Sequence, residues 1–246
     1  MFQKPVGKYS FRRFEPSSAF NKPFNMVLLG RKHTGKSCLM RDILYHLHRQ
    51  GYPRIVIFSG TEEGNHFFAS HVPSAYIHNH LDIGVIQTIV DTQRQVIASV
   101  KEAEEKLGRP TGIDTRVVIL LDDVVYQRGV LSNDTFRNIF FQGRHNNISL
   151  ILAAQYLMYV PVEQRGNIDY LVVLREHIPK NKARLYESFF GCFPDSKTFY
   201  YVLDSLTQNY EVCVLDNTGS DTLPEHCVRF YKAQLNLPPF RFATLR

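Results

Sequence analysis

The sequence predicts an α/β fold, built as a doubly wound and mostly parallel sheet with helices on both faces. Three observations predict it. Short apolar runs alternate with segments of helical periodicity along most of the 246 residues. Several runs are apolar throughout, as expected for strands buried on both faces of a parallel sheet. A glycine-containing turn at residues 30–37 joins the first apolar run to the first helical segment.

The first part of the chain is predicted to be an extended, basic arm over residues 1–23. It contains Pro5, Pro16 and Pro23, and its five basic residues are balanced by a single acidic residue, Glu15. The following apolar run at 24–29 predicts a strand, which the turn connects to a helix over 38–50. The apolar run at 54–59 predicts a second strand, whereas residues 60–85 have no clear period.

The middle and last parts of the chain repeat this alternation. Apolar residues at helical spacing over 86–107 predict a long helix that ends at Gly108 and Pro110. Ser132 or Asn133 is a suitable N-cap for the next helix. Continuous apolar runs predict strands at 116–121, 148–154, 170–174 and 210–215, and helical spacing predicts helices at 132–143, 180–190 and 196–203.

These elements define the expected domain organisation. One core spans residues 24–215, and with 44% hydrophobic residues the chain has enough apolar side chains to fill it. The C-terminal residues 216–246 begin with a turn and are rich in proline and aromatic residues. We expect them to form an extension packed on the core.

The turn at residues 30–37 has the phosphate-loop pattern G-x-x-x-x-G-K-S. In such a loop, glycines let backbone N–H groups point at phosphate oxygens, and the following helix adds the positive end of its dipole. Lys36 can reach the β- and γ-phosphates, and the Ser37 hydroxyl can bind Mg²⁺. The predicted nucleotide-binding residues are Gly30, Arg31, Lys32, His33, Thr34, Gly35, Lys36, Ser37 and Cys38.

Polar side chains end two of the other predicted strands. Asp122 and Asp123 follow the apolar run 116–121, in a pattern similar to Walker B, and Gln155 follows 148–154. The carboxyl ends of parallel strands meet at one edge of a sheet, so these residues and Lys36 are expected in one crevice. Asp122 is predicted to bind Mg²⁺, Asp123 to polarise the attacking water as a base, and Gln155 to sense the γ-phosphate.

An arginine usually stabilises the charge on a transferring phosphoryl group. Arg144 is the first candidate, because it lies in Gly-Arg-His just before the strand that ends at Gln155. Arg165 and Arg175 remain alternatives, and a surface role is equally open for each of them. An arginine that acts on a neighbouring subunit would require an oligomer.

The composition indicates which cellular compartment and which class of partner to expect. The net charge of +6 is compatible with a polyanionic partner. The four cysteines lie far apart without a C-x-x-C pair, which favours reduced thiols in a cytosolic compartment. The apolar runs are much shorter than the ~20 residues of a transmembrane helix, so no membrane span is expected.

The order of phosphate loop, Asp122-Asp123 and Gly-Arg-His before a strand ending in Gln155 resembles one family in particular. It is similar to the genome-packaging ATPases of the nucleo-cytoplasmic large DNA viruses, the poxvirus-type branch of the FtsK–HerA superfamily. The resemblance covers roughly residues 24–215. Two departures stand out: the loop interior at residues 31–34 is bulky and basic, and the second acid is Asp where the wider superfamily usually has Glu.

The resemblance implies a RecA-like P-loop NTPase core with an extra strand between the phosphate-loop strand and the Walker B strand. It implies ATP and Mg²⁺ as cofactors, a homo-oligomeric ring (hexamer or pentamer), and translocation of double-stranded DNA into a capsid. Capsid or inner-membrane proteins of the virion are further expected partners. The implied location is the virus assembly site in the host cytoplasm, with association with the virion as a second expectation.

DNA contacts of such a ring would come from loops that face its pore. Residues 60–85 and 126–133, which include Tyr126, Gln127 and Arg128, are the candidate loops. Contacts to phosphates would make binding depend on salt but not on base sequence.

GTPases and small-molecule kinases also contain a phosphate loop. A GTPase needs N-K-x-D, but Asn181-Lys182-Ala183-Arg184 has arginine where the guanine-binding aspartate belongs. A small-molecule kinase usually has an arginine-rich lid, and no such segment stands out. Two alternatives remain open: a nucleotide-gated binding or scaffold protein with little turnover, and a P-loop NTPase that processes DNA other than by packaging.

Overall fold

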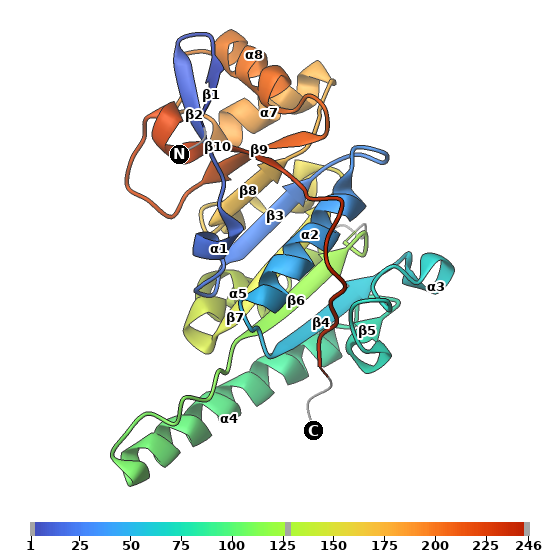
Figure 1. Ribbon diagram of the computed structural model, residues 1–246, viewed down its shortest axis with the longest axis vertical. Coiled ribbons are helices and arrows are strands. Elements are labelled where there is room, and N and C mark those ends of the chain that lie inside the picture. The colour runs from blue at the N-terminus through green and yellow to red at the C-terminus, as the bar shows by residue number, and fades with distance from the viewer. Residues whose placement is uncertain (1–2, 126–128, 244–246) are drawn as a thin grey trace.

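The computed structural model describes residues 3–125 and 129–243, and its centre is a single sheet of ten strands (Figure 1). The strand order is β1-β2-β10-β9-β8-β3-β7-β6-β4-β5. The strands are β1 (Gln3–Val6), β2 (Tyr9–Arg13), β3 (Asn25–Leu29), β4 (Arg54–Ser59), β5 (Ile77–His78), β6 (Val117–Asp122), β7 (Ile148–Ala154), β8 (Tyr170–Val173), β9 (Glu211–Asp216) and β10 (Val228–Lys232).

Six adjacent strands, from β8 to β5 in this order, run parallel. Every residue of β3, β6 and β7 is buried, which explains why these strands are apolar runs without alternation. β7 lies between the phosphate-loop strand β3 and the Walker B strand β6. The mostly parallel α/β sheet and the strand inserted between β3 and β6 are therefore confirmed.

Helices cover both faces of the sheet. Alternate β3 residues belong to different cores: Met26 and Leu28 pack with α2, whereas Val27 and Leu29 share the other core with helices α4, α5, α7 and α8. The helices are α1 (Pro16–Ala19), α2 (Lys36–Arg49), α3 (Glu62–Asn65), α4 (Ile83–Leu107), α5 (Asp134–Gln142), α6 (Val162–Arg165), α7 (Pro179–Phe189), α8 (Ser196–Leu206) and α9 (Pro224–Cys227).

The sheet continues beyond the predicted core into both terminal segments. Residues 1–23 were expected as an extended arm, but β1 and β2 pair with each other and β2 pairs with β10. Phe11 and Phe20 of this segment are fully buried. β10, in the predicted extension 216–246, pairs with β9 in antiparallel fashion. The sheet therefore runs through all three predicted segments.

After β10 the chain crosses α2 in an extended form (Figure 1). Two bonds attach it there: Arg41 Nη2 donates to the Leu235 carbonyl at 2.9 Å, and the Gln234 N–H donates to Asp42 Oδ1 at 3.2 Å. Further along, the Phe240 ring stacks on His71 with 4.3 Å between ring centroids. The C-terminal segment is thus fixed to the helix that follows the phosphate loop.

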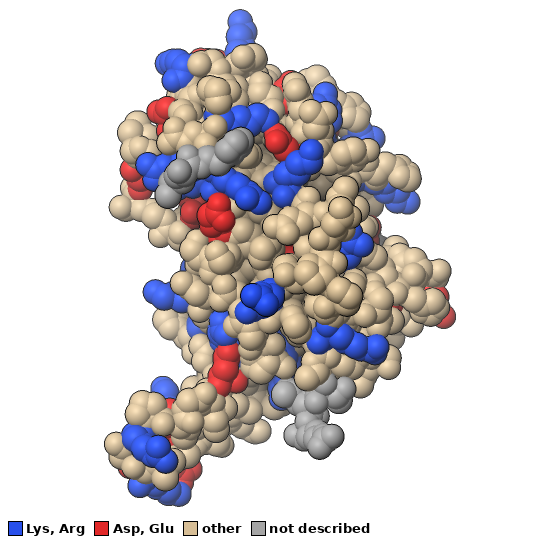
Figure 2. Space-filling model, in the orientation of Figure 1, with Lys and Arg blue, Asp and Glu red and all other residues tan. Residues whose placement is uncertain are grey.

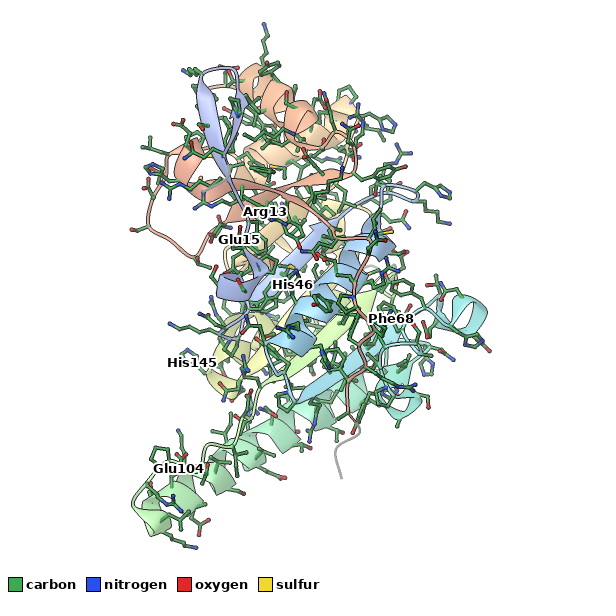
Figure 3. All side chains as sticks on the ribbon, in the orientation of Figure 1. Arg13, Glu15, His46, Phe68, Glu104 and His145 are labelled. Atoms are coloured by element: carbon green, nitrogen blue, oxygen red, sulfur yellow. The ribbon has the colours of Figure 1, made fainter. Side chains whose placement is uncertain are left out.

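Helix α4 is 25 residues long and extends well beyond the sheet (Figure 1). Asp82 caps its start by accepting from the Gly84 N–H at 2.8 Å. Gly108 ends it with φ +65°. Glu104, labelled at the outer end in Figure 3, accepts from the Thr111 N–H at 3.0 Å and holds the returning chain against the helix.

Both edge strands of the sheet are short. β1 has four residues, among them Pro5, and β5 has two.

Among the described residues, no helix combines the length and the apolar character that crossing a bilayer requires.

Candidate nucleotide-binding site

The phosphate loop lies between β3 and α2 at the carboxyl edge of the sheet. Gly35 precedes α2 with φ +95°, a conformation that glycine adopts without strain. Gly30 is needed for a different reason, because a Cβ there would lie 2.9 Å from Thr34 Oγ1 and 3.1 Å from Leu174 Cβ. Thr34 Oγ1 in turn donates to the Arg31 carbonyl at 2.8 Å, which closes the loop on itself.

Lys36 meets both predicted acids. Its ammonium nitrogen lies 2.7 Å from Asp123 Oδ1 and 3.8 Å from Asp122 Oδ1. Side chains alternate along a strand, so two consecutive residues reach one point only where the strand ends. β6 does end at Asp122, and Asp123 has φ +51°. The turn of the backbone thus brings both carboxylates to the same lysine.

Asp122 is the buried member of this group, with a side chain only 7% exposed. Burial raises its pKa to about 6, although the Lys36 ammonium acts in the opposite direction. Ser59 Oγ, at the end of β4, donates to Asp122 Oδ2 at 3.3 Å. Asp122 Oδ1 is buried and accepts no hydrogen bond.

This donor set fits Mg²⁺. A buried carboxylate oxygen without a hydrogen-bond partner is the kind of ligand that a hard cation takes, and the Ser37 hydroxyl is exposed in the same cleft. Mg²⁺ that accompanies a triphosphate usually takes few protein ligands and completes its shell with phosphate oxygens and water. Ser37 and Asp122, as predicted from the sequence, are therefore suitable ligands.

The loop and the acids line one open cleft of about 780 Å³, a volume in the ~300–1,000 Å³ range of small-molecule sites. All the predicted loop residues except Gly30 line it, from Arg31 to Cys38, together with Asp122 and Asp123. Gly30 is buried beneath the loop. The lining also includes Thr61, Asn65, Leu174, Asn209, Tyr210, Val212, Lys232, Ala233 and Leu235.

Of the residues in the interior of the phosphate loop, Arg31 contacts another part of the chain, whereas Lys32 and His33 are exposed. Arg31 Nη1 lies 2.7 Å from His177 Nε2, so the loop is tied to the chain after β8. Lys32 and His33 are exposed in the cleft, and His33 has φ +65°. Arg31 and Lys32 add positive charge to the cleft.

Gln155 is at the same edge but beside the cleft. It follows β7, next to Gly30, whose N–H donates to the Ala154 carbonyl at 3.1 Å. Gln155 lines a small adjoining pocket of about 30 Å³ with Arg31 and Arg175. Gln155 therefore does not line the cleft that contains Lys36, where the sequence had placed it, but the pocket beside it.

The three candidate arginines lie in different places. Arg144 is in the turn before β7 and forms an ion pair with Asp169, which precedes β8. Both residues are at the amino ends of their strands, the opposite edge of the sheet from the phosphate loop. Figure 3 labels the adjacent His145 on that side. Arg144 therefore does not reach the site of its own chain, because a residue that precedes a parallel strand lies at the edge away from ligands.

Arg175 is at the ligand-binding edge. It follows β8, is exposed, and lines the pocket beside Gln155 and Arg31. Arg165 instead donates to the Val160 carbonyl at 3.1 Å and to Ser188 Oγ at 3.2 Å, in a structural position. Of the three, Arg175 is the one that the fold places near the phosphate loop.

The described residues include only part of the candidate DNA loops. Residues 60–85 contain α3 and β5, and Glu62 organises them by accepting from the N–H groups of Phe68 and Ala69. Tyr126, Gln127 and Arg128 lie outside the described residues. Figure 2 shows basic side chains scattered among acidic ones over this face of the molecule, rather than gathered in one stripe.

Some residues of the site were not predicted from the sequence. Ser59 ends an apolar run, as Asp122 and Gln155 do, so the same argument applied to β4 would have found it. Tyr210 has no such signal, because it lies in a loop between α8 and β9 and reaches the cleft through the fold alone.

The chain is similar in sequence to proteins of large DNA viruses. A protein of Acanthamoeba polyphaga mimivirus is 26% identical over 228 residues, covering 92% of this chain and 78% of that protein. A protein of Invertebrate iridescent virus 6 is 29% identical over 196 residues, covering 80% of this chain and 71% of that protein.

Two solved structures have the same fold. The genome packaging NTPase B204 of Sulfolobus turreted icosahedral virus 2, in complex with AMP, matches with a TM-score of 0.60 and 13% identity, over 90% of this chain and all of that one. The pCW3 conjugation coupling protein TcpA, with ATPγS, matches with a TM-score of 0.57 and 13% identity, over 91% of this chain and 62% of that one. Both likenesses identify the fold of a P-loop NTPase.

The family model described as Poxvirus A32 protein matches residues 11–183, which include the phosphate loop, both acids, Gln155 and Arg175. This match covers well over half of the chain, and it agrees with the poxvirus-type resemblance of the sequence motifs. The chain belongs to the poxvirus A32 protein family.

Proposed function

We propose that this protein hydrolyses ATP to drive double-stranded viral DNA into a capsid, and that it works as a homo-oligomeric ring of six or five copies. One observation carries the proposal. In a member of the A32 family, Lys36 of the phosphate loop meets a buried and a partly buried carboxylate in one cleft. The shared fold with a viral genome packaging NTPase supports the same conclusion.

The phosphate loop would bind the triphosphate through its backbone N–H groups and Lys36. Ser37 and Asp122 would hold the accompanying Mg²⁺, whose chemistry there is to neutralise charge on the β- and γ-phosphates. Buried Asp122 has the negative charge that this requires, because a nearby divalent cation favours the ionised carboxylate.

Asp123 would act on the attacking water. Its Oδ1 lies 2.7 Å from Lys36 Nζ, so the two groups form an ion pair. The γ-phosphate of a bound nucleotide would compete for the same ammonium. Asp123 would then be free to accept a hydrogen bond from water. It would therefore be available as a base only when ATP is bound.

Gln155 and an arginine would complete the catalytic set. Gln155 follows Ala154, whose carbonyl accepts from the Gly30 N–H, so a change in the phosphate loop on nucleotide binding would be transmitted to Gln155. Arg175 is exposed at the ligand-binding edge, where it can act on this site or on a neighbour's site. A finger that acts on the next subunit would couple hydrolysis around a ring.

The proposed partners are double-stranded DNA and either capsid proteins or inner-membrane proteins of the virion. The proposed location is the virus assembly site in the host cytoplasm. The support for them is family membership together with the net charge of +6. DNA binding through phosphates would weaken steeply as salt rises.

The test is the ATPase rate with and without duplex DNA, measured across protein concentration. We expect stimulation by duplex DNA and a rate per chain that rises as the ring assembles. Lys36→Ala should lower turnover by about 100-fold or more, because the ammonium stabilises transferring charge. The matched control is Lys197→Ala, at an exposed lysine of α8 outside the cleft. A rate that ignores DNA and stays proportional to protein concentration would contradict a ring motor.

A second candidate function is a nucleotide-gated binding or scaffold protein with little turnover. The ion pair between Arg144 and Asp169 favours this second candidate, because a scaffold protein would need Arg144 only for its structure and not as a catalytic arginine. Tight nucleotide binding without multiple turnovers, in the presence of DNA and Mg²⁺, would support this candidate over the motor.

A further inference from the structure

The cleft has a second half to which the phosphate-binding residues do not contribute. Its lining comes from the loop between α8 and β9 (Asn209 and Tyr210), from β9 (Val212), and from the end of β10 and the segment after it (Lys232, Ala233 and Leu235). In Figure 1 these segments, orange and red, approach the turn between β3 and α2. Most of these side chains are apolar or aromatic, in contrast to the charged half around Lys36.

Tyr210 is the largest side chain in this half. It is 72% exposed, yet it lies against the phosphate loop: a Cβ built on Gly35 would be 3.2 Å from Tyr210 Cδ1. The ring therefore borders the loop without filling any core. An aromatic ring that is held at the wall of a polyphosphate site and left open to solvent is suited to stack on a planar ligand.

The backbone at this position is strained. Asn209 has φ +52° and Tyr210 has φ +61°, two consecutive left-handed residues that are not glycine. Asparagine tolerates this region, but for tyrosine it costs about 1 kcal/mol or more. Such strain persists where the surroundings impose it, and it concentrates at ligand sites.

The surroundings do impose it. The loop spans only residues 207–210 between α8 and β9. Buried Thr207 donates from Oγ1 to the Leu203 carbonyl at 2.7 Å at one end, and the Glu211 N–H donates to the Gln208 carbonyl at 2.9 Å at the other. Tyr210 is thus held in place at the rim of the cleft rather than left to swing freely.

The opposite wall is also anchored. The bonds from Arg41 to the Leu235 carbonyl and from the Gln234 N–H to Asp42 fix this segment to α2, the helix that begins at Lys36. Leu235 is 63% exposed in the cleft, with an apolar side chain turned to solvent. Two apolar surfaces thus border the space beside the phosphate loop.

We propose that this half of the cleft binds the base of the nucleoside triphosphate, with the Tyr210 ring stacked on the base and Ala233 and Leu235 forming the opposing wall. The proposal rests on the nucleotide site of the proposed function and deepens it. It assigns Tyr210 to base recognition, and it makes the C-terminal segment part of the nucleotide site.

The test compares two ligands that share a triphosphate but differ in the base. Equilibrium binding of the non-hydrolysable ATP analogue AMPPNP and of inorganic tripolyphosphate, both with Mg²⁺, is measured by calorimetry for Tyr210→Ala and Tyr210→Phe. Tyr210→Ala should weaken AMPPNP binding by about tenfold or more and leave tripolyphosphate binding within about twofold, because stacking acts on the base alone. Tyr210→Phe keeps a ring of the same shape and should bind both ligands as the unmodified protein does.

Two controls separate the possible causes. Tyr201→Ala removes a comparably exposed tyrosine of α8 that lies outside the cleft, and it should change neither affinity. Lys36→Ala should weaken both ligands together. AMPPNP binding by Tyr210→Ala at full strength, or a parallel loss of tripolyphosphate, would overturn the base-binding role. The proposed motor fails on a different result, the absence of DNA-stimulated turnover, which leaves the binding comparison intact.

Discussion

Replacing Asp122 by asparagine should stabilise the nucleotide-free protein while it abolishes hydrolysis. Burial raises the pKa of Asp122 to about 6 from the 3.8 that is usual for aspartate, so the ionised carboxylate is disfavoured in the folded chain. Such an acid contributes stability at low pH that is lost as the pH rises through the folded pKa. Asparagine has nearly the same shape and no charge to bury.

The magnitude follows from the two pKa values. A difference of about 2.2 units at 1.36 kcal/mol each makes ionised Asp122 cost up to about 3 kcal/mol at pH 7.5. By the same linkage relation the cost falls to about 1 kcal/mol at pH 4.5, where the unfolded chain also begins to take up the proton. The gain from Asp122→Asn should therefore be largest at neutral pH and shrink by about 2 kcal/mol on acidification.

The assay is chemical denaturation of both proteins in EDTA, without nucleotide, from pH 7.5 to 4.5. The matched control is Asp91→Asn on α4, where the side chain is 52% exposed and the change should stay below about 1 kcal/mol. An Asp122→Asn protein that is no more stable at pH 7.5, or whose advantage does not decline toward pH 4.5, would refute this account of the buried acid. Added Mg²⁺ and ATP should reverse the order of stability, because only the aspartate retains its full affinity for the metal.

Three further predictions concern the acid beside it and the arginines. Asp123→Asn should still bind ATP but hydrolyse it about 100-fold to 10,000-fold more slowly, measured by nucleotide binding and phosphate release; normal turnover would remove Asp123 from the base role. Arg144→Ala should lower the free energy of unfolding by about 1 kcal/mol, since buried Asp169 loses a partner whose own side chain is 41% exposed, and turnover should persist. A loss of turnover that Lys36→Ala chains restore on mixing would instead make Arg144 a finger in trans. Arg175→Ala should lower turnover by about 1,000-fold or more without loss of ATP binding, and unchanged turnover would exclude it as the finger.

The parallel core of the sheet was predictable because its strands are signalled by composition alone. A strand buried on both faces is a continuous apolar run, and β3, β6 and β7 all have this pattern. β1, β2 and β10 are only partly buried and mix lysine and arginine with apolar residues. β1 and β2 form a local hairpin, but β2 joins the sheet by pairing with β10, more than 200 residues further along the chain, and no local pattern reveals that contact.

The same contrast applies to the site. Lys36, Asp122 and Gln155 each follow a strand, so the sheet itself brings them to one edge, and a sequence argument can follow that geometry. Arg144 precedes a strand, and the same rule applied with more care places it at the other edge. Tyr210 could not be inferred, because its position depends on a left-handed backbone and on the packing of a loop against Gly35.

The short edge strands bear on how copies of this chain can meet. A long exposed edge invites another chain to add a strand by backbone pairing, and such contacts grow without limit into aggregates. Here one edge strand has four residues, including a proline without an N–H to donate, and the other has two. Within the described residues, backbone pairing through either edge strand would therefore be weak, and contacts between copies of this chain would have to come from side chains on helices and loops.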